Sequence, residues 1–214
     1  MLKKHLVKAV GFDLDQTFYQ DTQATKKAYR DTLYHLLAKN LKISVKKAQQ
    51  QFEKHYQILG SGTEAVRLLG INEPEKFSAR VSNQAKQHLY LKKDPELVNL
   101  IQYLKDKYLT FLVTASGEIG ARLKLKKLGL SADHDFQVSV FGDSAKASKT
   151  KGLSFSHVLK QTKLDPPAHV YVGDRDATDI LPAKRQGMQT VLVWGKSKQA
   201  DLSLPEIYQL DQYL

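Results

Sequence analysis

The sequence predicts an α/β protein in which a parallel sheet carries helices on both faces and an all-helical segment is inserted after the first strand. From residue 95 onward, short apolar runs alternate with amphipathic helical patterns, which is typical of a parallel sheet with helical crossovers. Residues 20–90 contain helical patterns and no clear strand pattern. A chain of 214 residues with 42% hydrophobic and 26% charged residues suits one domain with an insertion, or two small domains that share an interface.

The first strand is predicted over the apolar run of residues 9–12, and two aspartates, Asp13 and Asp15, follow it directly. The ligand crevice of an open α/β sheet lies beyond the carboxyl ends of its strands, which would place both carboxylates there. Two carboxylates this close repel each other unless a cation lies between them, so the pair indicates a hard metal ion such as Mg²⁺. A carboxylate can also act as a nucleophile and form an aspartyl-phosphate. Alternatively, the two aspartates simply cap the strand or open a turn.

Four helices are predicted between the first strand and residue 94. Apolar residues recur on one face of residues 23–40, and Ser44 is placed to cap a second helix that runs to about Leu59. Glycines then interrupt the pattern, and a third helix over residues 63–69 ends at Gly70. The fourth helix is predicted over residues 74–88. Together these helices would form the insertion.

Four further strands and four further helices complete the predicted core. The first of these helices begins at Pro95 after the cap residue Asp94, and the next one ends at Gly129. The lysine-rich run 122–127 is interpreted as the solvated face of that helix rather than as a nucleic-acid patch. The predicted strands cover residues 109–113, 136–141, 169–172 and 190–194, and the predicted helices cover residues 95–107, 118–128, 155–162 and 177–186.

Polar residues follow several of the predicted strands. After residues 109–113 comes Thr114-Ala115-Ser116-Gly117, a hydroxyl group with backbone amides at a helix N-terminus, which is a ready anion site, although any tight strand-to-helix turn would use similar residues. Three lysines, Lys146, Lys149 and Lys151, lie in the loop before the helix at residues 155–162. One of them could neutralise phosphate charge at this edge of the sheet, and at least two belong to a solvated loop.

A cluster of three carboxylates follows the strand at residues 169–172. Gly173 permits a sharp turn, and Asp174 would then point into the same crevice as Asp13 and Asp15. Carboxylates that converge in this way are explained by a divalent cation. Capping of the following helix explains Asp176 and leaves Asp174 and Asp179 for the site.

Composition limits the class of protein. The absence of cysteine excludes disulfides, thiolate catalysis and a cysteine-ligated zinc site, and it fits a cytoplasmic protein. No apolar run is long enough for a membrane span, and the N-terminal residues lack the apolar core of a signal peptide. The net charge of +11 is concentrated in residues 19–93, which hold 14 Lys/Arg against 6 Asp/Glu. This segment could attract anionic substrates or nucleic acid, and a lysine-rich solvated helical face is its simplest explanation.

Taken in order, these motifs resemble those of the haloacid dehalogenase-like hydrolase superfamily over nearly the whole chain. Residues 12–17 match its first motif, D-x-D-x-T, and Thr114 matches the Ser or Thr of its second. Residues 173–179 match its fourth motif, G-D-x-x-x-x-D, and residues 187–193 resemble the stretch that follows. The resemblance implies a Rossmann-like parallel sheet with an inserted helical cap.

Carried over to this chain, the resemblance implies a phosphatase mechanism. Asp13 would attack phosphorus and form an aspartyl-phosphate, and Asp15 would protonate the leaving oxygen and then activate water. An acid at the position of Asp15, together with Asp174, favours phosphoryl transfer over carbon–halogen cleavage. The expected metal is Mg²⁺, held by Asp13, the backbone carbonyl of Asp15, and Asp174, with Asp179 in support.

The resemblance also implies how phosphate would be bound. Thr114 and the backbone amide of Ala115 would bind phosphoryl oxygens. The lysine of the third motif is Lys149, six residues before Phe155 as in the superfamily's K-P-x-x-x-x-F pattern, with Lys151 as a rival because Thr150 replaces the proline.

An insertion at this point resembles the superfamily's C1 type of cap, so residues 1–18 and 94–214 are expected to form the core domain and residues 19–93 the cap domain. Members with such caps act mostly on small phosphorylated metabolites. Tyr19 and residues 55–63 resemble the pyrimidine 5′-nucleotidase-like branch, and a sugar phosphate is an equally open alternative to a nucleotide.

The competing hypothesis is a non-catalytic protein of this fold whose basic cap binds nucleic acid or a protein partner. The complete set of Asp13, Asp15, Thr114, a lysine and Asp174 argues against it, because a scaffold needs none of these residues. The sequence therefore favours a small phosphorylated metabolite over nucleic acid or a membrane as partner, in a monomer or a homodimer.

Overall fold

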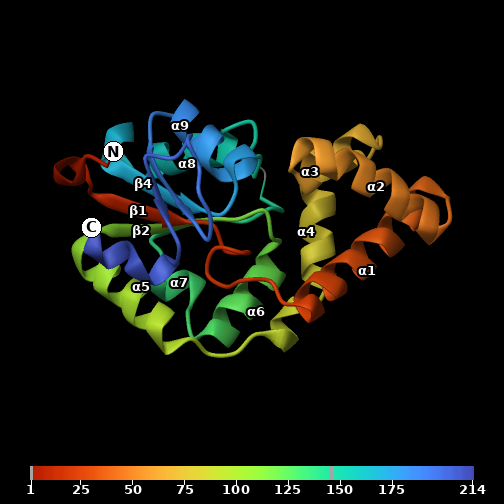
Figure 1. Cartoon of the computed structure of the whole chain (residues 1–214), viewed down its shortest axis with the longest axis horizontal. Coiled ribbons are helices and arrows are strands. Elements are labelled where there is room, and N and C mark those ends of the chain that lie inside the picture. The colour runs from red at the N-terminus through yellow and green to blue at the C-terminus, as the bar shows by residue number, and fades with distance from the viewer. Residues whose placement is uncertain (1, 145–146) are drawn as a thin grey trace.

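A computed structural model describes residues 2–144 and 147–214 and contains a six-stranded parallel sheet with helices on both faces (Figure 1). The strand order is β3-β2-β1-β4-β5-β6, so the first strand lies near the middle of the sheet. The predicted α/β fold is therefore confirmed. The strands are β1 (Ala9–Phe12), β2 (Leu109–Val113), β3 (Val138–Val140), β4 (His169–Gly173), β5 (Gln189–Val193) and β6 (Leu202–Leu204).

The central strands are buried on both faces, which explains why their sequences are continuous apolar runs. One hydrophobic cluster lies between the sheet and α5 (Pro95–Lys107) and α6 (Glu118–Leu128). A second lies under α8 (Leu153–Thr162) and α9 (Leu181–Arg185). Gly11 is required in β1, because a Cβ atom there would lie 2.0 Å from the Phe111 ring of the neighbouring strand.

Local sequence signals located several elements accurately. Helix α5, strand β2 and helix α6 have the predicted bounds residue for residue. The Asp94 carboxylate accepts a hydrogen bond from the Leu97 amide at 3.0 Å, and Gly129 ends α6 in a left-handed conformation with φ of 96°. Caps of this kind act within a few residues, so they can be read from sequence alone.

Other predicted bounds were wrong. The fourth helix, α4 (Pro74–Gln84), stops short of residue 88, and the 3₁₀ helix η2 (Gln87–Tyr90) follows it. The strand predicted over residues 136–141 shortens to β3, while the short helix α7 (Ala132–Asp135) and strand β6 were missed. The helix predicted over residues 177–186 begins as a π-helical turn (Asp176–Ile180), because Pro182 in α9 has no backbone N–H to donate to the preceding turn.

The inserted segment forms helices α1 (Gln23–Leu41), α2 (Val45–Leu59), α3 (Gly62–Leu68) and α4, which pack around a hydrophobic cluster of their own. They stand together at one end of the sheet, on the side away from both chain termini (Figure 1). Helix α4 packs against α6 of the core. Among the helices of residues 2–144 and 147–214, none has the length and apolar character of a membrane span.

Candidate active site

A cavity of about 470 Å³ lies between the carboxyl end of the sheet and the inserted helices. The core contributes Asp13, Asp15, Ala115, Ser116, Lys149 and Arg175 to its lining. The inserted segment contributes hydroxyl, amide and charged side chains that include Arg30, Tyr56, Ser61, Thr63, Ser78 and Gln87. The residues that follow β1, β2 and β4 thus meet at one edge of the sheet, as expected for a parallel arrangement.

Asp13 lies directly after β1 and is 4% exposed. Its amide donates to the Val172 carbonyl at 2.9 Å, so the strand geometry still holds its backbone. The Lys149 ammonium lies 3.0 Å from Asp13 Oδ1. Burial raises the pKa of Asp13 from its ordinary value of 3.8 to about 6; Lys149 opposes this rise, and Asp179 adds to it.

Of the lysines that the structure describes in the loop before α8, Lys149 is the one that contacts Asp13 and Asp179. It is buried and forms ion pairs with Asp13 and Asp179. Burial by itself would lower the pKa of the Lys149 ammonium, but the attraction of the two carboxylates outweighs desolvation and holds this pKa well above its ordinary value. Lys151 is exposed. Lys146 lies outside the described residues.

Asp13, Asp174 and Asp179 can bring one carboxylate oxygen each to within 4.8 Å of the others. Asp179 is saturated by donors: Lys149, the Arg175 amide at 3.1 Å and the Thr178 hydroxyl at 3.1 Å. Asp174 differs, because among the described residues its buried Oδ1 has no hydrogen-bond partner. An unpaired carboxylate oxygen beside two other buried carboxylates fits a hard divalent cation such as Mg²⁺.

The electrostatics of Asp174 agree with this fit. Burial raises its pKa from 3.8 to about 7; the Arg175 guanidinium, 3.2 Å away, lowers it, and Asp179 and Asp13 raise it. A group that resists ionisation in this way would be stabilised as a carboxylate by a nearby cation. Asp176, which was expected to cap a helix, instead accepts a hydrogen bond from the Ser197 hydroxyl at 2.6 Å.

The turn after β2 supplies candidate phosphate ligands. The Thr114 hydroxyl oxygen accepts a hydrogen bond from the Ser116 amide at 3.1 Å and is buried under the turn, whereas Ala115 and Ser116 line the cavity. Ser116 was not singled out from the sequence. Its hydroxyl donates to Asp15, so this residue belongs to the site.

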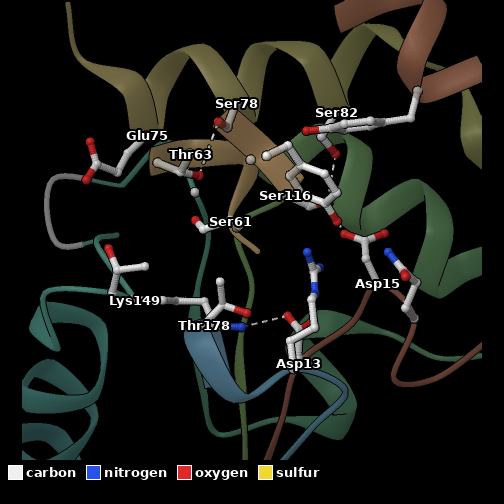
Figure 2. A pocket seen from close by; sticks show the side chains of 18 of the residues that line it. Asp13, Asp15, Ser61, Thr63, Glu75, Ser78, Ser82, Ser116, Lys149 and Thr178 are labelled. Carbon is white, nitrogen blue, oxygen red and sulfur yellow. Dashed lines mark hydrogen bonds and ion pairs between the residues drawn. The ribbon is translucent and has the colours of Figure 1, made fainter. Parts of the chain in front are cut away.

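Asp15 faces a different set of partners from Asp13. Figure 2 shows its carboxylate turned towards Ser116, while Asp13 faces Lys149. Tyr19 and Lys124 each donate to Asp15 Oδ1 at 2.5 Å. Burial would raise the pKa of Asp15, but the Lys124 charge and the hydrogen bonds from Lys124, Ser116 and Tyr19 outweigh it and hold the pKa below its ordinary value.

The interpretation of residues 122–127 as a solvated face was wrong for Lys124, which is 1% exposed. The sequence carried a signal for this burial. Lys124 is three residues after Ala121 and four before Leu128, both of which are buried in the core, so it lies on the apolar stripe of α6. A lysine at such a position is buried unless its side chain extends to solvent. Here the Lys124 ammonium forms an ion pair with Asp15 inside the protein.

Comparison with known proteins places this geometry in a family. The model of the haloacid dehalogenase-like hydrolase family matches residues 10–193. The glyceraldehyde 3-phosphate phosphatase of Methanopyrus kandleri is 25% identical over 205 residues, covering 88% of this chain and 84% of its own length.

Two solved structures share the fold over almost the entire chain. The phosphatase from Thermococcus onnurineus matches with a TM-score of 0.63 and 24% identity, covering 97% of each chain. The 2-haloacid dehalogenase from Pseudomonas syringae matches with a TM-score of 0.60 and 20% identity, covering 96% of this chain and 97% of its own. Because a phosphatase and a dehalogenase have this same fold, the chemistry must be argued from the site residues. Since the family model spans most of the sequence, the expected family is confirmed, and this chain belongs to the haloacid dehalogenase-like hydrolases.

Proposed function

We propose that this hydrolase is a Mg²⁺-dependent phosphatase that cleaves a small phosphomonoester through an aspartyl-phosphate on Asp13. The observation that carries the proposal is the buried cluster in which Lys149 pairs with Asp13 and Asp179. Beside this pair lies Asp174, whose buried Oδ1 has no hydrogen-bond partner within residues 2–144 and 147–214. A charged cluster this deeply buried is costly to maintain, and an anionic substrate with a metal ion accounts for it. In this proposal residues 1–18 and 94–214 form the core domain, and residues 19–93 form a cap domain over the cavity.

In the first step a carboxylate oxygen of Asp13 attacks phosphorus, the bond from phosphorus to the leaving oxygen breaks, and Asp15 gives its proton to that oxygen. The negative charge of bound phosphate raises the pKa of the neighbouring Asp15 and so favours the protonated acid. Lys149 balances charge on Asp13 and the phosphoryl oxygens. The Ala115 amide and the Thr114 hydroxyl are the proposed donors to these oxygens.

In the second step Asp15, now ionised, accepts a proton from water as that water attacks phosphorus. The bond between phosphorus and the Asp13 oxygen breaks, which releases inorganic phosphate and restores the Asp13 carboxylate. Asp15 thus returns to its protonated form, and the cycle balances. The two carboxylates need different environments for these roles, and their separate partners support this division.

The metal would be held by Asp13, Asp174 and the backbone carbonyl of Asp15, with Asp179 in support through its bonds to Lys149 and the Arg175 amide. When bound, Mg²⁺ neutralises negative charge on the carboxylates and on the phosphoryl group.

For the substrate we propose a short phosphorylated polyhydroxy compound, with glyceraldehyde 3-phosphate as the first one to test. The name of the Methanopyrus kandleri relative and the hydroxyl-rich lining supplied by Ser61, Thr63 and Ser78 support this choice. Tyr56 is the aromatic residue of the segment 55–63 that resembles the nucleotidase-like branch; it stacks on Phe52 at 5.6 Å and lies 4.6 Å from the Arg30 guanidinium. These contacts favour a packing role, and the nucleotidase-like resemblance stays a prediction.

Phosphate release from a panel of compounds tests this proposal. Glyceraldehyde 3-phosphate, other sugar phosphates, pyrimidine nucleotides and p-nitrophenyl phosphate would be compared with Mg²⁺ and with EDTA. We expect metal-dependent release that is fastest for the small polyhydroxy phosphates. Absence of phosphate release from the whole panel, combined with salt-sensitive retention on nucleic acid, would instead support the non-catalytic alternative.

The raised pKa values predict that Mg²⁺ stabilises the protein more at high pH. Asp13 and Asp174 keep their protons in the folded state up to about pH 6 and pH 7, so a metal ion must displace protons below these values. We expect the Mg²⁺-induced rise in unfolding temperature to be larger at about pH 8 than at about pH 5. Without metal the sign is the opposite: proton binding at these groups stabilises the folded state at low pH, and that contribution is lost as pH rises through 6 to 7.

The measurement is thermal unfolding with and without Mg²⁺ at both pH values. Asp174→Asn is the control, because an amide oxygen cannot titrate and the pH dependence of the Mg²⁺ effect should shrink. An equal rise in unfolding temperature at the two pH values would contradict the proposed metal ligands.

A further inference from the structure

Lys124 occupies a place that the proposed mechanism does not use. It lies on α6, is 1% exposed, and its ammonium contacts Asp15 Oδ1 at 2.5 Å and Ser116 Oγ at 2.7 Å. Two weaker contacts reach the inserted segment, at 3.3 Å to Ser82 Oγ and 3.4 Å to Gln87 Oε1. A lysine buried this completely is rare unless it is paired with an opposite charge. Here its two close partners are Asp15, the proposed general acid, and Ser116.

The hydrogen bonds in this group have one consistent direction. The Ser82 hydroxyl donates to Ser116 Oγ at 2.7 Å, and the Ser116 hydroxyl donates to Asp15 Oδ2 (Figure 2). The three N–H groups of Lys124 serve Asp15, Ser116 and the acceptors on the inserted segment, so all of them can be satisfied. Asp15 is the last acceptor in this series of hydrogen bonds, and both of its carboxylate oxygens accept one. Its orientation therefore depends on donors that are themselves held in place.

Lys124 emerges from a tight contact between the core and the inserted helices. A Cβ atom at Gly120, one turn before it, would lie 2.8 Å from the Ser82 carbonyl oxygen of α4. The Gly120 amide also donates to Asn83 Oδ1 at 2.8 Å. Gln87 in turn donates to the Thr25 carbonyl of α1 at 3.4 Å. The ammonium is thus the point where α4, η2 and α6 meet Asp15.

We infer that Lys124 is a positioning residue that holds the Asp15 carboxylate in place and links it to the seating of the inserted helices. The inference rests on the proposed function, in which Asp15 protonates the leaving oxygen. Loss of Lys124 should therefore harm substrates whose leaving group needs a proton more than substrates whose leaving group departs as a stable anion. A general loss of folding or of phosphate binding would harm both kinds equally.

The test compares Lys124→Met with Lys126→Met, an exposed lysine of the same helix, as the matched control. For each variant, kcat/KM is measured for glycerol phosphate, whose leaving group is an alcohol, and for p-nitrophenyl phosphate. We expect Lys124→Met to lower kcat/KM for glycerol phosphate by about 10²-fold and to lower that for p-nitrophenyl phosphate about tenfold less, with Lys126→Met unchanged. Equal losses for both substrates, or no loss, would overturn the inference.

Two additions keep the outcome decisive. If Lys124→Met does not fold, Lys124→Gln retains a donor for Asp15 and should show the same selective loss to a smaller degree. If wild type hydrolyses neither substrate, the proposed function itself fails. Crystal structures of wild type and variant then decide the positioning role alone, because an unchanged Asp15 orientation without Lys124 would overturn it.

Discussion

Replacing Asp13 by Asn is expected to lower phosphatase turnover by about 10⁴-fold or more, since an amide cannot act as the attacking group. The Asp13 side chain lies at the end of β1 with Lys149 3.0 Å from Oδ1, and Asn preserves its size in that position. Phosphate release from the best substrate of wild type measures the loss. Acid-quenched mixtures with radiolabelled substrate should show phosphate attached to wild-type protein and none attached to the variant.

Folding provides the control for this variant. Burial raises the pKa of Asp13 to about 6, so its charged form is destabilising in the metal-free protein. In this variant Lys149 keeps its ion pair with Asp179, so its buried charge is not left unpaired. The unfolding temperature without Mg²⁺ should therefore stay unchanged or rise at neutral pH, while the stabilisation by Mg²⁺ weakens. Turnover that survives in a well-folded Asp13→Asn protein would rule out the aspartyl-phosphate mechanism.

The second large effect is expected from Lys149→Met, which should lower kcat by about 10³-fold, whereas Lys151→Met should leave kcat within about twofold of wild type. Both lysines lie in one short loop, but Lys149 is 6% exposed between Asp13 and Asp179, and Lys151 is exposed to solvent. Loss of Lys149 removes the charge that balances Asp13 and the incoming phosphate. The measurement is steady-state phosphate release by the two variants in parallel.

Stability must be measured alongside activity for this pair. Removing one partner of a buried ion pair typically costs about 3–5 kcal/mol, so Lys149→Met should also unfold at a lower temperature. Assays are therefore run well below its unfolding midpoint, where most of the protein is folded. If Lys151→Met lost activity and Lys149→Met kept it, the assignment of the third-motif lysine would be reversed.

Elements defined by local signals were predictable. Helix α5 starts at a proline after the Asp94 cap, and α6 ends at Gly129, so both could be located within a residue. Strand β6 was not predictable in the same way. It has three residues, of which Leu202 and Ser203 are only half-buried, and its pairing with β5 makes it a strand. The π-helical turn before α9 was also missed. Pro182 lies inside the helix predicted over residues 177–186 and lacks the backbone N–H that an α-helical turn would use there.

The chain order of the motifs determined which carboxylates would meet. Asp13, Asp174 and Asp179 follow strands whose carboxyl ends a parallel sheet brings to one edge, and one oxygen of each lies within 4.8 Å of the others. This inference needs only the parallel direction of the strands and no side-chain detail. Sequence alone therefore determined the fold and the family, and it predicted that Asp13, Asp174 and Asp179 would lie together.

Only the tertiary structure decided which lysine side chains pair with the carboxylates of the site. Lys149 and Lys151 are two positions apart in one loop, but Lys149 is buried against Asp13 and Lys151 is exposed to solvent. The path of the loop past the buried carboxylates decides which of the two lysines reaches them. Lys124 lies 109 residues from Asp15 in the chain. Its ion pair with Asp15 exists because α6 packs against α4 and the Lys124 ammonium lies where these helices meet Asp15. The physical reason is the same in both cases: burying a lysine depends on long-range packing that supplies an opposite charge, and the local sequence does not encode that partner.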